Sequence, residues 1–176
     1  MKKTWLYSMI GALLFTMTFG LSTADASSSK QDRLIVNLTA DTSVGPYQIV
    51  DTDGQMYTYA DRQSYEVAEQ QFTAKWAIAS KKVVGILASD YATESYQHNS
   101  FKGWSYTTPV GYSTNFNNSK YNDEISSIKT ARKSSGTKVC YHKNGGEPCK
   151  TFGPGLDISY VGNGWNDQIS YVIVYR

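Results

Sequence analysis

A short polar motif that could bind a metal ion occurs twice in the C-terminal half of the sequence. The first copy runs from Tyr121 to Ser126 (YNDEIS) and the second from Trp165 to Ser170 (WNDQIS), with matching positions 44 residues apart. Each copy offers amide, carboxylate and hydroxyl oxygens, which suit a hard cation such as calcium far better than zinc. A fixed spacing of this length indicates two copies of one supersecondary unit that pack against each other.

The same residues also have a purely structural interpretation. Asn, Asp and Ser side chains often hydrogen-bond the backbone of their own turn, without any metal. A single copy would favour that interpretation. Two copies at a constant spacing, each with a hydroxyl in the same place, favour calcium ligands.

The repeated pattern resembles the calcium-binding motif of microbial βγ-crystallin domains, Asn/Asp-Asn/Asp-x-x-Ser/Thr, which we call the clamp. Residues 122–126 form the first clamp and residues 166–170 the second. The family's other signature, aromatic-x4-aromatic-x-Gly, is matched by Tyr96, Phe101 and Gly103. The resemblance covers about residues 90–176. It implies a mainly β fold, with a sandwich of two Greek keys and eight short strands over residues 92–176.

The resemblance also implies a set of calcium ligands. In the family, each ion takes a backbone carbonyl and a hydroxyl from one clamp and a carboxylate from the other. The ligands expected here are Glu124 (carbonyl), Ser126 and Asp167 for one site, and Gln168 (carbonyl), Ser170 and Asp123 for the other. A further carbonyl is expected from each corner loop, with water completing the shell. One carboxylate per site predicts weak binding, with a Kd on the order of 10⁻⁴–10⁻³ M or somewhat tighter.

The two cysteines of the chain predict a disulfide. Cys140 and Cys149 flank a turn that contains Asn144-Gly-Gly. In an oxidising compartment such a pair should close, and His142 alone adds too few soft ligands for a metal site.

The second repeat departs from the family at its aromatic corner. If Tyr141 takes the place of Tyr96, the aromatic and the glycine that should follow are replaced by Gly146 and Pro148. The segment is then one residue shorter than in the first repeat. We expect the disulfide to replace the missing aromatic packing.

The region before residue 92 predicts an N-terminal α+β segment of no recognised family, spanning residues 27–91 and packed on the crystallin-like half. Apolar residues three or four apart from Tyr65 to Ala79 predict an amphipathic helix, capped by Asp61 or Ser64. The expected strands are 34–38, a hairpin of 47–50 with 55–59 around an Asp-Gly turn, and 83–87.

The first residues predict export. Lys2 and Lys3, an apolar run from Trp5 to Leu21 and Ala24-Asp-Ala26 are typical of a secretory signal peptide over residues 1–26. A membrane anchor is the alternative interpretation. Since no other apolar stretch is long enough to span a bilayer, we expect a secreted protein, extracellular or periplasmic or associated with the cell wall.

Charge and side-chain chemistry argue against two classes of function. With 17 Lys and Arg against 15 Asp and Glu and no basic run, the chain lacks the concentrated positive charge that binds nucleic acid. His98 and His142 are the only histidines, and neither belongs to a recognisable nucleophile motif, so we expect no enzyme activity.

The sequence thus predicts a non-enzymatic, calcium-binding, βγ-crystallin-like protein with a structural or stress-related role. A secreted protease inhibitor, or an antimicrobial factor of the killer-toxin kind, is the alternative, because similar folds serve those functions. Such a protein would act on an extracellular protein target through an exposed rigid loop. Residues 144–148 are the candidate for that loop.

Overall fold

The structure is a computed structural model that describes residues 33–38, 46–82 and 88–176. The predicted signal peptide and the strand predicted at 83–87 lie outside these residues. None of the helices in the described ranges is long and apolar enough to cross a membrane.

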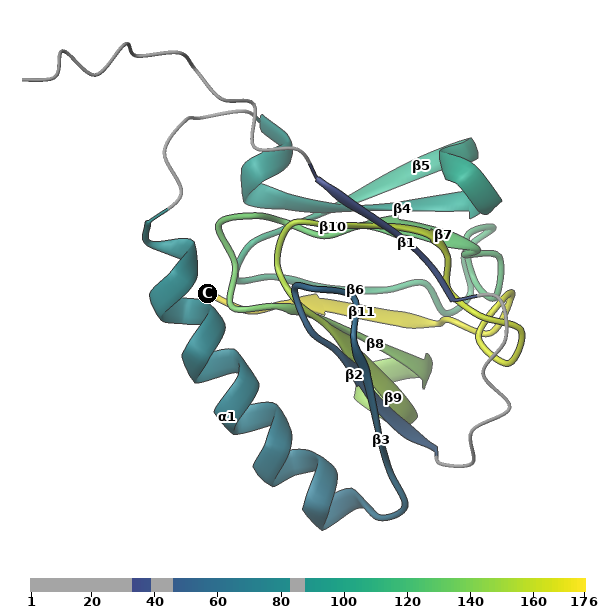
Figure 1. Cartoon of the computed structure of the whole chain (residues 1–176). Helices are drawn as coiled ribbons and strands as arrows, with labels where there is room; N and C mark the ends of the chain where they lie inside the picture. Colours follow the sequence, from purple (N-terminus) through teal and green to yellow (C-terminus); the bar gives the residue numbers. More distant parts are fainter. Residues whose placement is uncertain (1–32, 39–45, 83–87) are drawn as a thin grey trace, which may run out of the picture.

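The described residues form β-strands, one long helix and short 3-10 turns (Figure 1). The strands are β1 (Leu34–Asn37), β2 (Tyr47–Val50), β3 (Met56–Tyr59), β4 (Ala92–His98), β5 (Lys102–Pro109), β6 (Ser113–Asn115), β7 (Ser127–Lys129), β8 (Thr137–His142), β9 (Gly146–Phe152), β10 (Leu156–Tyr160) and β11 (Tyr171–Val174). The helix is α1 (Arg62–Ser80), and the turns are η1 (Ala88–Tyr91), η2 (Asn99–Phe101) and η3 (Lys143–Gly145).

Two sheets form a sandwich, with strand orders β1-β10-β7-β4-β5 and β3-β2-β9-β8-β11-β6. The first repeat supplies β4 to β7 and the second β8 to β11. Each repeat places its third strand in the sheet of the other, because β6 pairs with β11 and β10 pairs with β7. This exchange interlocks two Greek keys. The predicted mainly β, two-Greek-key sandwich is confirmed.

Alternation of side chains along the strands fills the space between the sheets. In β11, Val172 and Val174 are fully buried and their neighbours are partly exposed. They join a core that includes Ile128 and Ile158 from the facing sheet. Trp165, just before the second clamp, is also buried in this core, so the loop that carries the clamp is anchored to both sheets.

The N-terminal strands add to both sheets of the sandwich. β1 runs parallel to β10, and β2 runs parallel to β9. The hairpin of β2 with β3 forms as predicted, with Tyr47 opposite Tyr59. The segment before residue 92 therefore extends the crystallin-like sheets with parallel partners. The boundary at residue 91, taken from the repeat pattern, stays a prediction.

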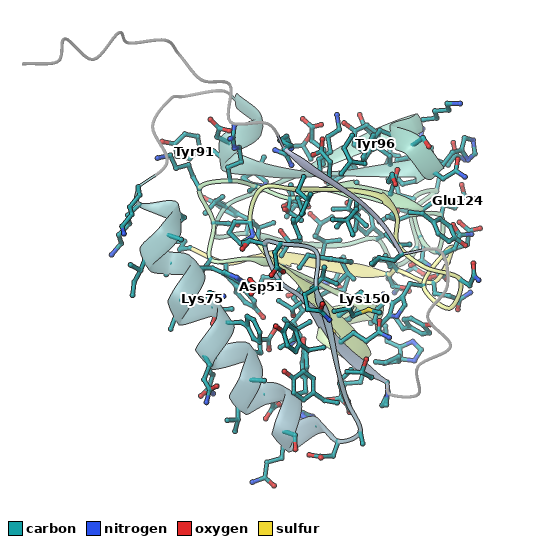
Figure 2. All side chains as sticks on the ribbon, viewed as in Figure 1. Asp51, Lys75, Tyr91, Tyr96, Glu124 and Lys150 are labelled. Carbon is teal, nitrogen blue, oxygen red and sulfur yellow. A yellow bond between two sulfur atoms is a disulfide. The ribbon has the colours of Figure 1, made fainter. Side chains whose placement is uncertain are left out.

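Helix α1 covers the outer face of the sheet that contains β2, β8 and β9, and its prediction is confirmed. Asp61 caps the helix, since its Oδ1 accepts a hydrogen bond from the backbone N–H of Ser64 at 2.8 Å. Tyr65 and Trp76 are buried against the sheet. Asp51 and Lys75, labelled in Figure 2, form an ion pair of 2.8 Å where the helix meets the end of β2.

The register of the strands corrects the alignment of the second corner. Tyr96 on β4 lies opposite Ser105 on β5, and Cys140 on β8 lies opposite Cys149 on β9. Cys140 therefore takes the place of Tyr96, and the 44-residue spacing holds through the corner. The prediction that Tyr141 replaces Tyr96 in a shortened segment is wrong. A shift of one residue moves a strand's side chains to the opposite face of the sheet.

Cys140 and Cys149 form the predicted disulfide. Both are buried and belong to the cluster of side chains beneath α1, with Tyr65 and Trp76. In the first repeat, Tyr96 instead packs edge-on against Phe101, with ring centroids 5.6 Å apart. A covalent bond thus occupies the place in the second repeat where the first has an aromatic pair.

Candidate metal centre

The two clamps lie in equivalent loops, the first between β6 and β7 and the second between β10 and β11. Asp123 and Asp167 both have positive φ, at 55° and 57°. Asn and Asp are the residue types that tolerate this left-handed conformation best after glycine. In each clamp the preceding Asn donates a side-chain hydrogen bond to the Asp carboxylate, at 2.6 Å for Asn122 and 2.7 Å for Asn166. The two loops therefore hold their carboxylates in the same way.

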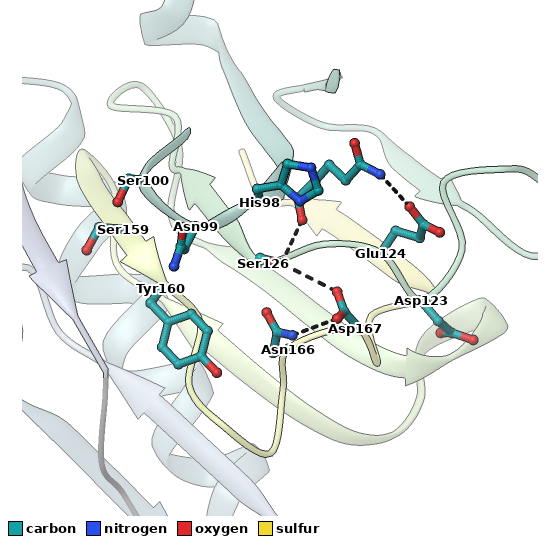
Figure 3. A pocket seen from close by; sticks show the side chains of 11 residues that line it. His98, Asn99, Ser100, Asp123, Glu124, Ser126, Ser159, Tyr160, Asn166 and Asp167 are labelled. Carbon is teal, nitrogen blue, oxygen red and sulfur yellow. Dashed lines mark hydrogen bonds between the residues drawn. The ribbon is translucent and has the colours of Figure 1, made fainter. Parts of the chain in front are cut away.

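Each clamp carboxylate reaches the hydroxyl of the other clamp. The Oγ of Ser170 lies 2.8 Å from Oδ1 of Asp123. The Oγ of Ser126 lies 3.4 Å from Oδ1 of Asp167, as the dashed line between them marks in Figure 3. These are the residues that the resemblance paired across the repeats, and the structure brings both pairs together.

A backbone carbonyl also lies beside the pair of Ser126 and Asp167. Gln97, on the bulged end of β4, accepts a hydrogen bond from the Ser126 hydroxyl at its carbonyl oxygen, with a distance of 2.6 Å. A carbonyl from the corner was expected, but the sequence did not say which. At the constant spacing of the repeats, the corresponding residue in the second half is Tyr141.

The types of oxygen donor around Ser126 suit a calcium ion. Oxygens that share one calcium ion at about 2.4 Å and at right angles lie about 3.4 Å apart. The 3.4 Å between the Ser126 hydroxyl and the Asp167 carboxylate matches this spacing, whereas the 2.6 Å between that hydroxyl and the Gln97 carbonyl is a hydrogen-bond distance. The donors are oxygens throughout, and calcium prefers such a set of hydroxyl, carbonyl and carboxylate ligands.

Three carboxylates are among the residues that line the pocket beside this site, whose volume is about 860 Å³. Asp123, Glu124 and Asp167 all line it, and its described lining contains no lysine or arginine. This concentration of negative charge attracts cations. Across the described residues, no group of three or more His, Cys, Asp or Glu side chains is arranged so that it could hold a metal ion.

Two predicted ligands differ in the surroundings of their side chains. Glu124 and Gln168 enter the predicted sites through their backbone carbonyls. The Glu124 side chain is partly buried and accepts a hydrogen bond from the Gln97 side chain at 2.8 Å. The Gln168 side chain is exposed. The sequence analysis did not single out the Glu124 carboxylate, although the change from Glu to Gln between the clamps was visible.

The loop proposed for contact with a target protein is only partly exposed to solvent. Asn144 is exposed, but residues 145–148 are partly buried. Glu147 forms a hydrogen bond with Tyr47 and an ion pair of 3.0 Å with Arg62 at the start of α1. The prediction of an exposed loop over residues 144–148 therefore holds for Asn144, whereas the remaining residues are only partly exposed and the N-terminal segment contacts Glu147.

No protein-family model matches the sequence, and a search of curated proteins finds no match. Several solved structures are similar to the C-terminal half. A βγ-crystallin domain from Clostridium beijerinckii is 29% identical, with 48% of this chain and 96% of that chain covered and a TM-score of 0.41. A βγ-crystallin from Ciona intestinalis is 23% identical, with 47% and 98% covered and a TM-score of 0.39.

A third structure shows a βγ-crystallin domain of the Abundant Perithecial Protein from Neurospora crassa in its Ca²⁺-bound form. It is 16% identical, with 52% of this chain and 94% of that chain covered and a TM-score of 0.39. Residues 92–176 form interlocked Greek keys, and the two clamps meet between them. The resemblance predicted from the sequence is confirmed.

Proposed function

We propose that this protein binds two calcium ions, one at each pair of clamp residues that meet across the repeats. The observation that carries this proposal is the exchange of carboxylates, in which Asp167 faces Ser126 and Asp123 faces Ser170. Two turns that only bonded their own backbone would have no need of a carboxylate from the other repeat.

The chain would hold the first ion with the Ser126 hydroxyl, the Asp167 carboxylate and the carbonyls of Gln97 and Glu124. It would hold the second with the Ser170 hydroxyl, the Asp123 carboxylate and the Gln168 carbonyl. Calcium supplies a positive charge that neutralises these oxygens and binds them to one centre. Because each ion takes ligands from both repeats, binding favours the folded state over the unfolded one.

The role we propose is structural and non-enzymatic, in a secreted protein. The predicted signal peptide supports export to a compartment that permits disulfides and contains calcium. The buried bridge between Cys140 and Cys149 is consistent with such a compartment. In that setting, weak sites would be filled and would make the sandwich more rigid.

Calorimetric titration with calcium tests the proposal. The unmodified protein is expected to bind two ions, each with a Kd on the order of 10⁻⁴–10⁻³ M or somewhat tighter. Ser126→Ala and Ser170→Ala should each remove one site. Ser64→Ala is the matched control, because its exposed hydroxyl bonds the Asp61 carboxylate at the start of α1, outside the clamps. An unmodified protein that binds no calcium, or serine variants that bind two ions as before, would overturn the proposal.

A further inference from the structure

The two clamps are not equivalent in charge. At the constant spacing of the repeats, Glu124 of the first clamp corresponds to Gln168 of the second. Glu124 is partly buried and lines the pocket beside Ser126, whereas Gln168 is exposed and does not line it. The pocket beside Ser126 is therefore lined by the Glu124 carboxylate as well as by those of Asp123 and Asp167. A neutral amide stands in the corresponding place beside Ser170.

The extra carboxylate is bonded to a residue that carries one of the site's oxygens. Glu124 accepts a hydrogen bond from the Gln97 side-chain amide at 2.8 Å. The backbone carbonyl of the same Gln97 accepts the hydroxyl of Ser126 at 2.6 Å. The residue after Gln97 is fixed too, because the Ser127 hydroxyl donates to the carbonyl of His98 at 2.6 Å. Glu124 thus holds the strand end that presents the Gln97 carbonyl.

The corner loop of the second repeat is fixed by a different contact. Asn115 and Asn144 form two hydrogen bonds, of 2.7 and 2.8 Å, between β6 and the turn η3. Both partners are neutral. Asn144 lies three positions beyond Tyr141, the residue that corresponds to Gln97. This contact fixes the tip of the turn and adds no charge to the Ser170 site.

We propose that Glu124 is a positioning residue that makes the Ser126 site the tighter of the two calcium sites. It acts in two ways, by holding the Gln97 carbonyl in place and by adding negative charge beside the ion. The inference rests on the proposed function, since it concerns the order of affinity of the two sites.

The test measures each site alone. Ser170→Ala leaves the Ser126 site, and Ser126→Ala leaves the Ser170 site. In the Ser170→Ala protein, Glu124→Ala should raise the calcium Kd about tenfold, the lower end of the usual effect of removing an outer-shell partner. In the Ser126→Ala protein, the same change should alter the Kd less than about twofold. Glu66→Ala, which removes a carboxylate from α1 outside the pocket, is the control and should change neither Kd.

Two milder variants separate the contributions of the hydrogen bond and the charge. Gln97→Ala keeps the backbone carbonyl and the Glu124 charge but removes the side-chain link. Glu124→Gln keeps an acceptor oxygen for Gln97 but removes the charge. Each should raise the Kd of the Ser126 site by about threefold, less than Glu124→Ala does, because each removes one contribution of the outer-shell carboxylate.

A second readout does not depend on calcium. Without the ion, Glu124→Ala and Gln97→Ala should speed amide hydrogen exchange in residues 97–103, while Glu124→Gln should leave it near the unmodified rate. Exchange in residues 141–147 should stay unchanged in all three and serves as the internal control.

The possible results are distinguishable. If the unmodified protein binds no calcium, both the proposed function and this inference fail. If it binds two ions but Glu124→Ala weakens both sites equally, or neither, only the inference fails. The inference also fails if the Ser170 site proves the tighter one in the two serine variants, or if exchange in residues 97–103 does not respond to loss of the Glu124 side chain.

Discussion

The hydroxyl of Ser170 donates a hydrogen bond of 2.8 Å to Asp123, a residue 47 positions earlier in the chain and in the other repeat. Ser126 and Asp167 form the mirror contact, at 3.4 Å. Backbone hydrogen bonds reinforce the exchange, because the N–H of Asp123 donates to Ile169 and that of Asp167 donates to Ile125. The clamps are therefore elements shared by the two Greek keys, and an ion bound at either one would contact both.

Calcium is expected to raise the thermal stability of the protein. At a free calcium concentration of 100 times the Kd, each occupied site should add about 2.7 kcal/mol to the free energy of unfolding. Thermal denaturation followed by circular dichroism, with and without calcium, measures this shift. Ser126→Ala and Ser170→Ala should each lose about half of it. An unchanged midpoint in the presence of saturating calcium would show that the ions do not link the repeats.

Loss of the disulfide is expected to destabilise the fold. Replacing both Cys140 and Cys149 by Ala should lower the free energy of unfolding by about 2–3 kcal/mol, because the bridge restricts the unfolded chain. Chemical denaturation of the variant and of the unmodified protein measures the difference. Tyr96→Ala, at the corresponding place in the first repeat, is the comparison. Equal denaturation midpoints for the double variant and the unmodified protein would refute a structural role for the bridge.

The repeat made much of this architecture predictable. The spacing of the clamps indicated two copies of one unit, and the resemblance to βγ-crystallin domains implied the two Greek keys and the pairing of Asp123 with Ser170. The partners of β1 and β2 were not predictable, because an apolar run does not specify which strand edge it joins. The correspondence of Cys140 with Tyr96 was not predicted, for a related reason. Tyr141 has the same residue type as Tyr96 and was therefore aligned with it. Only the pairing of the strands shows that Cys140 occupies the corresponding position, because adjacent residues of a strand face opposite sides of the sheet.

Asp51 is expected to make the free energy of unfolding depend on pH. Burial alone would raise its pKa, but hydrogen bonds from Lys75 and Trp76 outweigh burial and hold the pKa of Asp51 below its ordinary value. A carboxylate with a lowered pKa stabilises the fold above its unfolded pKa of about 3.9, and this contribution is lost as the pH falls through the folded value.

Asp51→Ala should therefore lower the free energy of unfolding at pH 7 by about 2–3 kcal/mol, and the difference from the unmodified protein should shrink below about pH 4. Urea denaturation over a series of pH values provides the measurement. Asp53→Ala, in the exposed turn of the same hairpin, should change stability by no more than about 0.5 kcal/mol. A difference that stays constant down to pH 2 would contradict this account.

Glu69 is expected to attach α1 to the sheet. Its carboxylate accepts hydrogen bonds from Thr151 at 2.6 Å and Lys138 at 2.8 Å, and also contacts the hydroxyls of Tyr65 and Tyr175. Burial, together with the nearby Glu69 carboxylate, raises the pKa of both tyrosines, so their hydroxyls stay protonated and able to donate at alkaline pH.

Glu69→Ala would leave Lys138 and these hydroxyls without their shared acceptor. The free energy of unfolding should fall by about 3 kcal/mol. Glu66→Ala, one turn away on the exposed side of α1, should cost no more than about 0.5 kcal/mol and controls for the loss of a helical Glu. Equal effects of the two substitutions in urea denaturation would show that the buried network does not hold the helix.

Such a network is not predictable from the sequence, because it joins residues of α1, β8 and β9 and Tyr175, which no repeat or period relates. The same holds for the hydrogen bond between Glu124 and Gln97. Local patterns located the helix and the first strands, whereas the contacts between elements that give the site its asymmetry follow from packing alone.

The stoichiometry of calcium binding in paired variants tests the exchange of carboxylates most directly. If each clamp lends its Asp to the other, the double variant Ser126→Ala/Asp167→Ala loses one site and still binds one ion. The double variant Ser126→Ala/Asp123→Ala, with both changes in one clamp, loses both sites. Calorimetric titration should therefore give one ion for the first protein and none for the second. The reverse result, no ion for the first and one for the second, would contradict the shared sites.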